Sequence, residues 1–203
     1  RYDEYTTKNK NSHMKLFEKF KKKEANILLG TQMIAKGLDF EDVTFVGVLN
    51  ADMSLNVPDF RASERTFQLL CQVAGRSGRG QKQGTVIIQT YNPEHYAIVS
   101  AANHDYQSFY QQEMIYRQKV QYPPYCHLVS IIVQSKDESL LHQSAIDIKK
   151  YLVTHIHQGA ILGPAKSVIY KMQDIYRERI LIKFINSQEV YQALEVVNDY
   201  YNK

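Results

Sequence analysis

The sequence predicts an α/β protein in two parts, a layer of parallel strands and helices over residues 1–121 and a small α+β domain over residues 122–203. Three observations support this prediction. Short apolar runs alternate with amphipathic stretches in the first part, a pattern typical of a parallel sheet. Residues 122–125 (Tyr-Pro-Pro-Tyr) interrupt the pattern, because proline lacks an amide donor and restricts the residue before it. A strand–helix–strand–strand–helix pattern follows the interruption.

The elements of the first part are indicated by apolar periodicity and by helix-start signals. Ser12 is a candidate N-cap, and Pro58 precedes a helix whose inner face is apolar. The short apolar runs are partly β-branched, so we expect buried strands there. In order, the predicted elements are a helix after Asn11-Ser12, strands at 27–29 and 44–49, a helix at 59–76, a strand at 85–91 and a helix at 93–118.

The second part shows period-2 and period-3.6 patterns in a βαββα order. This order suits a small α+β sandwich with its helices on one face of a mixed sheet. The predicted elements are a strand at 127–134, a helix at 139–157, strands at 166–171 and 179–185, and a helix at 188–200.

Composition is that of an ordinary soluble globular protein, with 44% apolar and 23% charged residues. Apolar stretches fall far short of the ~20 residues that span a bilayer, so we expect a cytoplasmic protein without membrane contact. The net charge is +4, divided into +3 (16 basic, 13 acidic) and +1 (9 basic, 8 acidic) between the two parts. Such mild charge is not typical of a strong autonomous nucleic-acid binder. Cys71 and Cys126 form no C-x-x-C pair, so no zinc site is expected here.

Residues 71–80 (Cys-Gln-Val-Ala-Gly-Arg-Ser-Gly-Arg-Gly) place two arginines among glycines. The guanidinium groups of Arg76 and Arg79 match phosphate oxygens in geometry and keep their charge. The neighbouring glycines let the backbone approach a phosphate closely. The alternatives are a solvated Gly-Arg turn and, for Arg76, a simple cap of the helix C-terminus.

Residues 30–39 (Gly-Thr-Gln-Met-Ile-Ala-Lys-Gly-Leu-Asp) form a second glycine-containing motif. It is not a Walker A loop, because Lys36 is followed by Gly37 rather than by Ser or Thr. With residues 72–79 it resembles, in order and separation, motifs V and VI of the second RecA-like lobe of superfamily 2 helicases.

Further stretches sharpen the resemblance. The runs at 49–70 and 88–98, the Tyr-Pro-Pro-Tyr break and the Gly-Pro-Ala at 163–165 are similar to the C-terminal portion of the bacterial primosomal protein N′ family of replication-restart DNA helicases. The resemblance implies a RecA-like lobe 2, incomplete at its N-terminus, and a C-terminal α+β domain that ends with one more strand. It also implies ATP-dependent 3′→5′ unwinding that restarts stalled forks and promotes primosome assembly.

The resemblance also implies roles for particular residues. Arg76 and Arg79 would reach the γ-phosphate of ATP as arginine fingers. The nucleotide side would be lined by Gly37, Asp39, Gln72 and Gly75, and the DNA track by Thr31, Gln32 and Lys36. ATP and Mg²⁺ would be bound mainly by the other motor lobe, and zinc by a module outside this chain. The implied partners are forked and single-stranded DNA, single-stranded DNA-binding protein and primosome proteins.

Two other interpretations remain open. The chain could belong to another superfamily 2 fork-remodelling motor, similar to RecG, or be a non-catalytic DNA- or protein-docking module. Without Walker A and DExH motifs, the isolated chain is predicted to lack ATPase activity.

A predicted hairpin in the second part mixes aromatic and basic residues. These residues could stack bases and neutralise phosphates, or they could form an ordinary polar surface. They are Tyr170, Lys171, Tyr176, Arg177 and Arg179.

Overall fold

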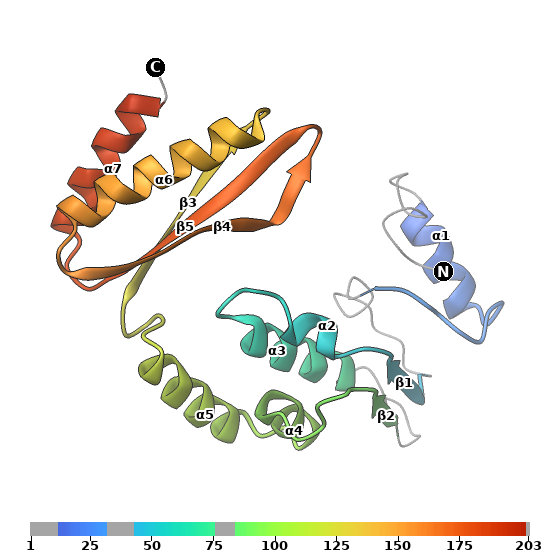
Figure 1. Ribbon diagram of the computed structural model, residues 1–203. Helices are drawn as coiled ribbons and strands as arrows, with labels where there is room; N and C mark the ends of the chain where they lie inside the picture. The colour runs from blue at the N-terminus through green and yellow to red at the C-terminus, as the bar shows by residue number, and fades with distance from the viewer. Residues whose placement is uncertain (1–11, 32–42, 76–83, 202–203) are drawn as a thin grey trace. The chain divides into compact units, whose positions relative to one another are not determined.

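The computed structural model describes residues 12–31, 43–75 and 84–201 (Figure 1). The chain divides into two compact units, Arg1–Glu113 and Met114–Lys203. This division falls inside helix α5 (Tyr106–Lys119), whereas the expected boundary lies after that helix, between residues 121 and 122. The helix ends at Lys119, just before the Tyr-Pro-Pro-Tyr break.

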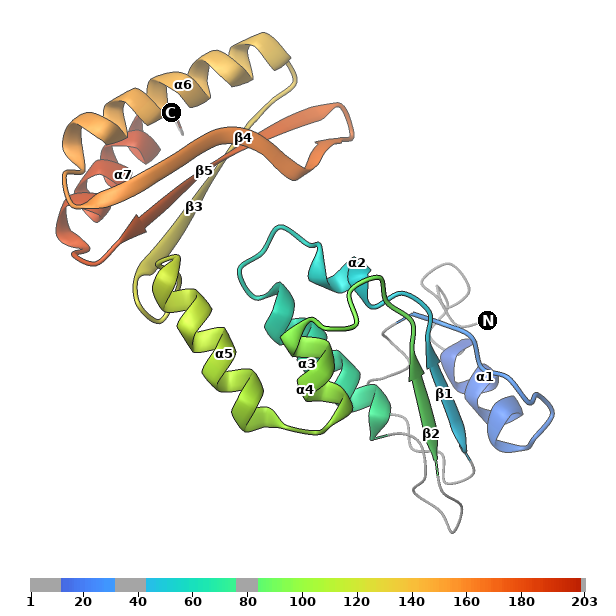
Figure 2. The same cartoon turned by 60° about the horizontal axis from the view of Figure 1, so that its bottom comes forward.

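The first unit contains a two-stranded parallel sheet and several helices (Figure 2). Strands β1 and β2 pair in register from Phe45 opposite Thr85 to Val48 opposite Ile88. The elements in order are α1 (Ser12–Lys21), β1 (Phe45–Val48), α2 (Asp52–Leu55), α3 (Ala62–Ala74), β2 (Thr85–Ile88) and α4 (Tyr96–Ala102), followed by α5.

The prediction of a buried strand at residues 27–29 is wrong. These residues have no strand conformation, and the side chains of Ile27 and Leu29 are 83% and 52% exposed. Strand β1 is present but only partly buried, and the side chain of Phe45 is 58% exposed. Apolar, β-branched composition makes a segment suitable for burial on both faces, but a strand also needs a neighbour to hydrogen-bond and layers to cover it.

The helix predicted over residues 93–118 is interrupted, giving α4 and α5. Asn103 ends α4, and His104 has a left-handed backbone with φ of 53°. The carboxylate of Asp105 then accepts hydrogen bonds from the backbone N–H and the hydroxyl of Ser108, at 2.9 and 2.5 Å. Short polar side chains of this kind favour helix ends over helix interiors, which outweighs the apolar periodicity that continues across them.

The core of the first unit lies between α3, α4 and α5. Phe67 and Leu70 on the inner face of α3 pack against Ala97, Ala101 and Phe109. The rings of Phe67 and Phe109 stack with centroids 4.3 Å apart. Leu70 is only 2% exposed, so its truncation to alanine would cost about 2–5 kcal/mol. This cluster therefore holds α3 firmly in the first unit.

The second unit has the expected order β3 (His127–Ser135), α6 (Glu138–His155), β4 (Gly159–Met172), β5 (Ile175–Phe184) and α7 (Gln188–Tyr201). The sheet order is β3-β5-β4, and both pairings are antiparallel. The prediction of a mixed sheet is wrong for a topological reason. Strands β3 and β4 run in the same direction, but the β4–β5 hairpin places β5 between them.

Helices α6 and α7 cover one face of this sheet (Figure 1). Alternate residues of β5 face them, and Ile180 and Ile182 are fully buried against Leu152 of α6 and Val190 of α7. Helix α6 begins at an N-cap, because the carboxylate of Asp137 accepts the backbone N–H of Leu140 at 2.9 Å. The sheet therefore has one apolar face, which the helices cover. The residues of β5 that alternate with Ile180 and Ile182 lie on the other face.

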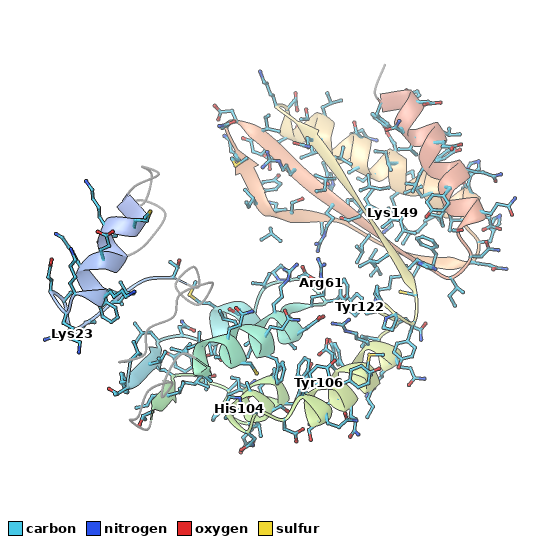
Figure 3. All side chains as sticks on the ribbon, turned by 180° about the vertical axis from the view of Figure 1, so that it is seen from behind. Lys23, Arg61, His104, Tyr106, Tyr122 and Lys149 are labelled. Carbon is cyan, nitrogen blue, oxygen red and sulfur yellow. The ribbon has the colours of Figure 1, made fainter. Side chains whose placement is uncertain are left out.

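Gly163 interrupts the register of β4 where its backbone has φ of +98°. Lys149 of α6 (labelled in Figure 3) donates to the Gly163 carbonyl. A Cβ atom at this position would lie 2.6 Å from the carbonyl oxygen of Arg179. Both the positive φ and the contact with backbone require glycine here.

We expect Gly163→Ala to lower the free energy of unfolding by roughly 1–3 kcal/mol, because the variant must strain β4 or push it away from β5. Differential scanning calorimetry on the whole chain measures the effect. Gly47→Ala is the matched control, since its added Cβ would meet no atom closer than 3.5 Å. Equal loss of stability in the two variants would contradict this account of Gly163.

Candidate functional site

The structure describes three of the nine site residues that the sequence singles out, namely Thr31, Gln72 and Gly75. Thr31 is exposed and follows residues 27–29. The other six lie outside the described residues, and their roles stay predictions: Gln32, Lys36, Gly37, Asp39, Arg76 and Arg79.

Helix α3 positions the glutamine–glycine part of the motif. Gln72 is exposed two residues before the helix ends at Ala74, on the side opposite the buried Leu70. Gly75 is the C-cap, and its backbone N–H donates to the carbonyl of Cys71 at 3.0 Å. Because α3 is packed along its inner face, it fixes the point from which residue 76 continues. A helix C-terminus carries partial negative charge, which favours a cation there.

The carboxyl ends of β1 and β2 form a second, well-defined site that the sequence did not indicate. The carboxylate of Asp52 accepts a hydrogen bond from the Thr90 hydroxyl and another from the Tyr91 backbone N–H, both at 2.9 Å. The backbone adds a bond from Ala51 N to the Gln89 carbonyl at 3.1 Å. The two segments that leave the parallel strands are thus tied together.

The hydrogen bonds also set the charge of Asp52. The backbone N–H of Tyr91 is the main cause that holds the pKa of this carboxyl below its ordinary value. Burial acts in the opposite direction, and the Thr90 hydroxyl lowers the pKa further. Asp52 is therefore an anion at neutral pH. The only sequence signal for it would have been an acidic residue shortly after a strand.

A shallow pocket of about 100 Å³ lies at this edge, lined by Leu49, Asn50, Asp52, Gln89, Thr90 and Tyr91. A second one, of about 270 Å³, lies between the end of α3, β2 and the end of α4. Its lining residues are Ala74, Gly84, Val86, Ile88, Ala101, Ala102 and His104. In open α/β sheets, ligands bind outside the carboxyl ends of the strands, which favours the first pocket as a ligand site.

The predicted hairpin is the β4–β5 connection, closed by Gln173 and Asp174 with φ of 52° and 58°. Its two tyrosines already have partners within the second unit. The ammonium group of Lys171 lies 4.7 Å from the Tyr176 ring centroid. Tyr170 donates its hydroxyl to Glu138 on α6, which raises the pKa of Tyr170 to about 12.

Two of the basic residues, Arg177 and Arg179, lie on the other face of the sheet from Tyr176, because successive strand residues alternate. Arg177 donates to the Gln134 side chain at 3.2 Å, and Arg179 faces the same way. Lys183, further along β5, donates to the carbonyl of Val120 at 2.8 Å and lies over the Tyr122 ring. The structure thus separates Arg177 and Arg179 from the hairpin tyrosines but keeps Lys171 beside Tyr176.

Two further observations bear on the class of protein. In the ranges 12–31, 43–75 and 84–201, no three or more His, Cys, Asp or Glu side chains are grouped so that they could hold a metal ion. No helix in the described part of the chain is both long and apolar enough to cross a membrane.

Comparison with known proteins defines that class. Residues 2–81 match the helicase conserved C-terminal domain, so the first unit contains a helicase domain. Residues 118–201 match the primosomal protein N C-terminal domain.

Curated relatives agree with both matches. Replication restart protein PriA of Bacillus subtilis is 45% identical over 204 residues, covering all of this chain and 25% of that protein. The proteins of the same name from Synechocystis and Chlamydia pneumoniae are 39% and 41% identical and cover 96% and 90% of the chain. The chain belongs to the PriA family of primosomal replication restart proteins, and it spans about a quarter of the length of these relatives.

We expect Asp52→Asn to destabilise the first unit at neutral pH, because the amide replaces one acceptor oxygen with a donor that faces another donor. The folded-state pKa of Asp52 is lowered, so its ionised form stabilises the fold above the unfolded-state pKa. That contribution disappears as the pH falls through the folded-state pKa. The stability difference between the two proteins should therefore shrink in acid.

Urea unfolding of both proteins from neutral to strongly acidic pH measures this difference. Asp147→Asn on α6 is the control, since Asp147 is half exposed and its ion pair with Lys150 spans 3.7 Å. A difference for Asp52→Asn that stays constant with pH would show that the charge of Asp52 has no part in holding the two segments together.

Proposed function

We propose that this chain supplies part of the second RecA-like motor lobe and the C-terminal domain of an ATP-dependent 3′→5′ DNA helicase that restarts stalled replication forks and promotes primosome assembly. Membership of the PriA family supports the helicase class and the replication role. The observation that carries the catalytic part is structural: α3 is a packed helix that ends at Ala74 and Gly75, directly before Arg76.

Arg76 and Arg79 are the proposed arginine fingers. ATP, when bound by the rest of the protein, supplies a γ-phosphoryl group on which negative charge builds during transfer. Guanidinium groups held at the γ-phosphate would stabilise that charge without reorganising at the moment of reaction. Gln72, Gly75, Gly37 and Asp39 are proposed to line the nucleotide.

The chain does not have the residues needed to hold ATP alone. Its sequence has no Walker A pattern, so the β-phosphate and Mg²⁺ would be bound by the other lobe. We propose that zinc, if present in the complete protein, is bound elsewhere, because the chain has only Cys71 and Cys126. The proposed site of action is the cytoplasm.

Thr31, Gln32 and Lys36 are proposed to position a DNA strand through its phosphates. Contacts of this kind carry no sequence information, which suits a motor that moves along any DNA. Arg177 and Arg179, on the sheet face away from α6 and α7, are further candidates for phosphate contacts. The proposed partners are forked and single-stranded DNA, single-stranded DNA-binding protein and the other primosome proteins.

A RecG-like motor and a non-catalytic docking module are the alternatives that this proposal replaces. The family assignment favours a replication restart motor over the first. The presence in the sequence of Gly37, Asp39, Arg76 and Arg79 argues against a decayed, purely docking lobe.

In the full-length protein, Arg79→Ala should lower kcat for ATP hydrolysis by roughly 10³ or more while ATP binding stays nearly unchanged. The isolated chain should show no ATPase activity. Arg61→Ala is the control: Arg61 immediately precedes α3 at its opposite end and pairs with Asp59 at 3.3 Å (Arg61 is labelled in Figure 3). Near-normal DNA-stimulated ATPase in the Arg79 variant would contradict the arginine-finger proposal.

The isolated chain should bind single-stranded DNA weakly, and its affinity should fall steeply as salt rises. The first part carries a net charge of only +3, and phosphate contacts release counterions. Fluorescence anisotropy of a labelled oligonucleotide at increasing salt measures both properties. Tight binding that persists at high salt would instead favour a dedicated docking module.

A further inference from the structure

Tyr91 is the most exposed large apolar or aromatic side chain in the described part of the chain, at 91%. A single exposed ring is common on protein surfaces and means little by itself. What distinguishes Tyr91 is its place. It follows β2 at the carboxyl edge of the parallel strands, beside the shallow pocket described above.

The backbone beneath this ring is fixed by a chain of hydrogen bonds. The Tyr91 N–H donates to Asp52 Oδ2 and the Thr90 hydroxyl donates to Asp52 Oδ1, both at 2.9 Å. The N–H of Asn92 then donates to the Thr90 hydroxyl at 3.0 Å. A ring on such a support loses little conformational freedom when a ligand covers it, so more of the contact energy is kept as affinity.

The surroundings of the ring restrict the kind of ligand. Leu49 lines the pocket and Met53 directly follows Asp52, and both apolar side chains are exposed, at 67% and 72%. Asn50 and Gln89, two residues with amide side chains, also line the pocket. The ionised Asp52 disfavours a phosphate group directly at this position.

A flat, neutral group linked to phosphates that lie further away satisfies these conditions. We infer that Tyr91 is a stacking platform for a base of single-stranded DNA. Every base has a π-face, so stacking tolerates any sequence, as a translocating motor requires. Duplex DNA does not fit, because its base faces are covered by one another. The inference rests on the proposed function, which brings a DNA strand to this lobe.

The absence of tryptophan from the sequence allows a direct test on the whole chain. Tyr91→Trp introduces a single tryptophan, which can be excited apart from the tyrosines and keeps an aromatic ring at the site. Its emission should be quenched by oligothymidylate, and not by an abasic strand of the same length, which carries the phosphates without bases. Tyr200→Trp on α7, where the native ring is 74% exposed, is the control and should respond to neither.

Affinity gives an independent readout. Tyr91→Ala should weaken oligothymidylate binding roughly 5- to 150-fold, the effect of losing one base–aromatic contact, while Tyr91→Phe should bind normally. Neither variant should change binding of the abasic strand or the melting temperature, since the ring is exposed and Asp52 bonds the backbone of residue 91.

The possible results separate the two proposals. If the native chain binds oligothymidylate but Tyr91→Trp is not quenched and Tyr91→Ala binds normally, the stacking inference is wrong and the proposed function stands. Equal weakening toward both strands would also overturn it, because a phosphate or folding effect would then explain the loss. Failure of the native chain to bind either strand would contradict the proposed function together with the inference.

Discussion

Packing of the inner face of α3 against α4 and α5 is the constraint on which the functional interpretation depends. Leu70 and Phe67 are almost completely buried in this contact, and close-packed interiors hold their elements in one arrangement. The helix therefore ends at a fixed place, with Gly75 as its cap and Arg76 as the next residue. Phosphoryl transfer needs accurately placed charges, because misplacing a charged group by about 1 Å can cost much of its effect.

A second constraint operates at the carboxyl edge of the parallel strands. The carboxylate of Asp52 binds Thr90 and Tyr91, which lie 38 and 39 positions away in the sequence. These hydrogen bonds hold together the two segments that follow β1 and β2. The four-residue strands alone would fix the positions of these segments less firmly. The same bonds give Asp52 a lowered pKa and give Tyr91 a rigid base, so the electrostatics and the shape of this edge have one origin.

The local sequence pattern predicted the helices and strands well, but it predicted their burial and their long-range contacts less well. The parallel pairing of β1 with β2 and the βαββα order of the second unit follow from apolar periodicity, which is a property of neighbouring residues. Burial at residues 27–29 did not follow, because it depends on what covers them. The break at His104 arose from polar side chains competing for the backbone, and the antiparallel sheet arose from the position of β5. The Asp52 contacts could not be predicted, since nothing local indicates a partner so distant in sequence.

The central claim is that the residues after α3 act on the transition state of ATP hydrolysis. The most direct test compares the affinity of the full-length native protein and its Arg79→Ala variant for two ligands: ADP–aluminium fluoride with Mg²⁺, which imitates the transition state, and a non-hydrolysable ATP analogue. The account predicts that the variant loses affinity for the first by roughly 100-fold or more, with little change for the second. Equal loss for both ligands, or no loss for either, would contradict it.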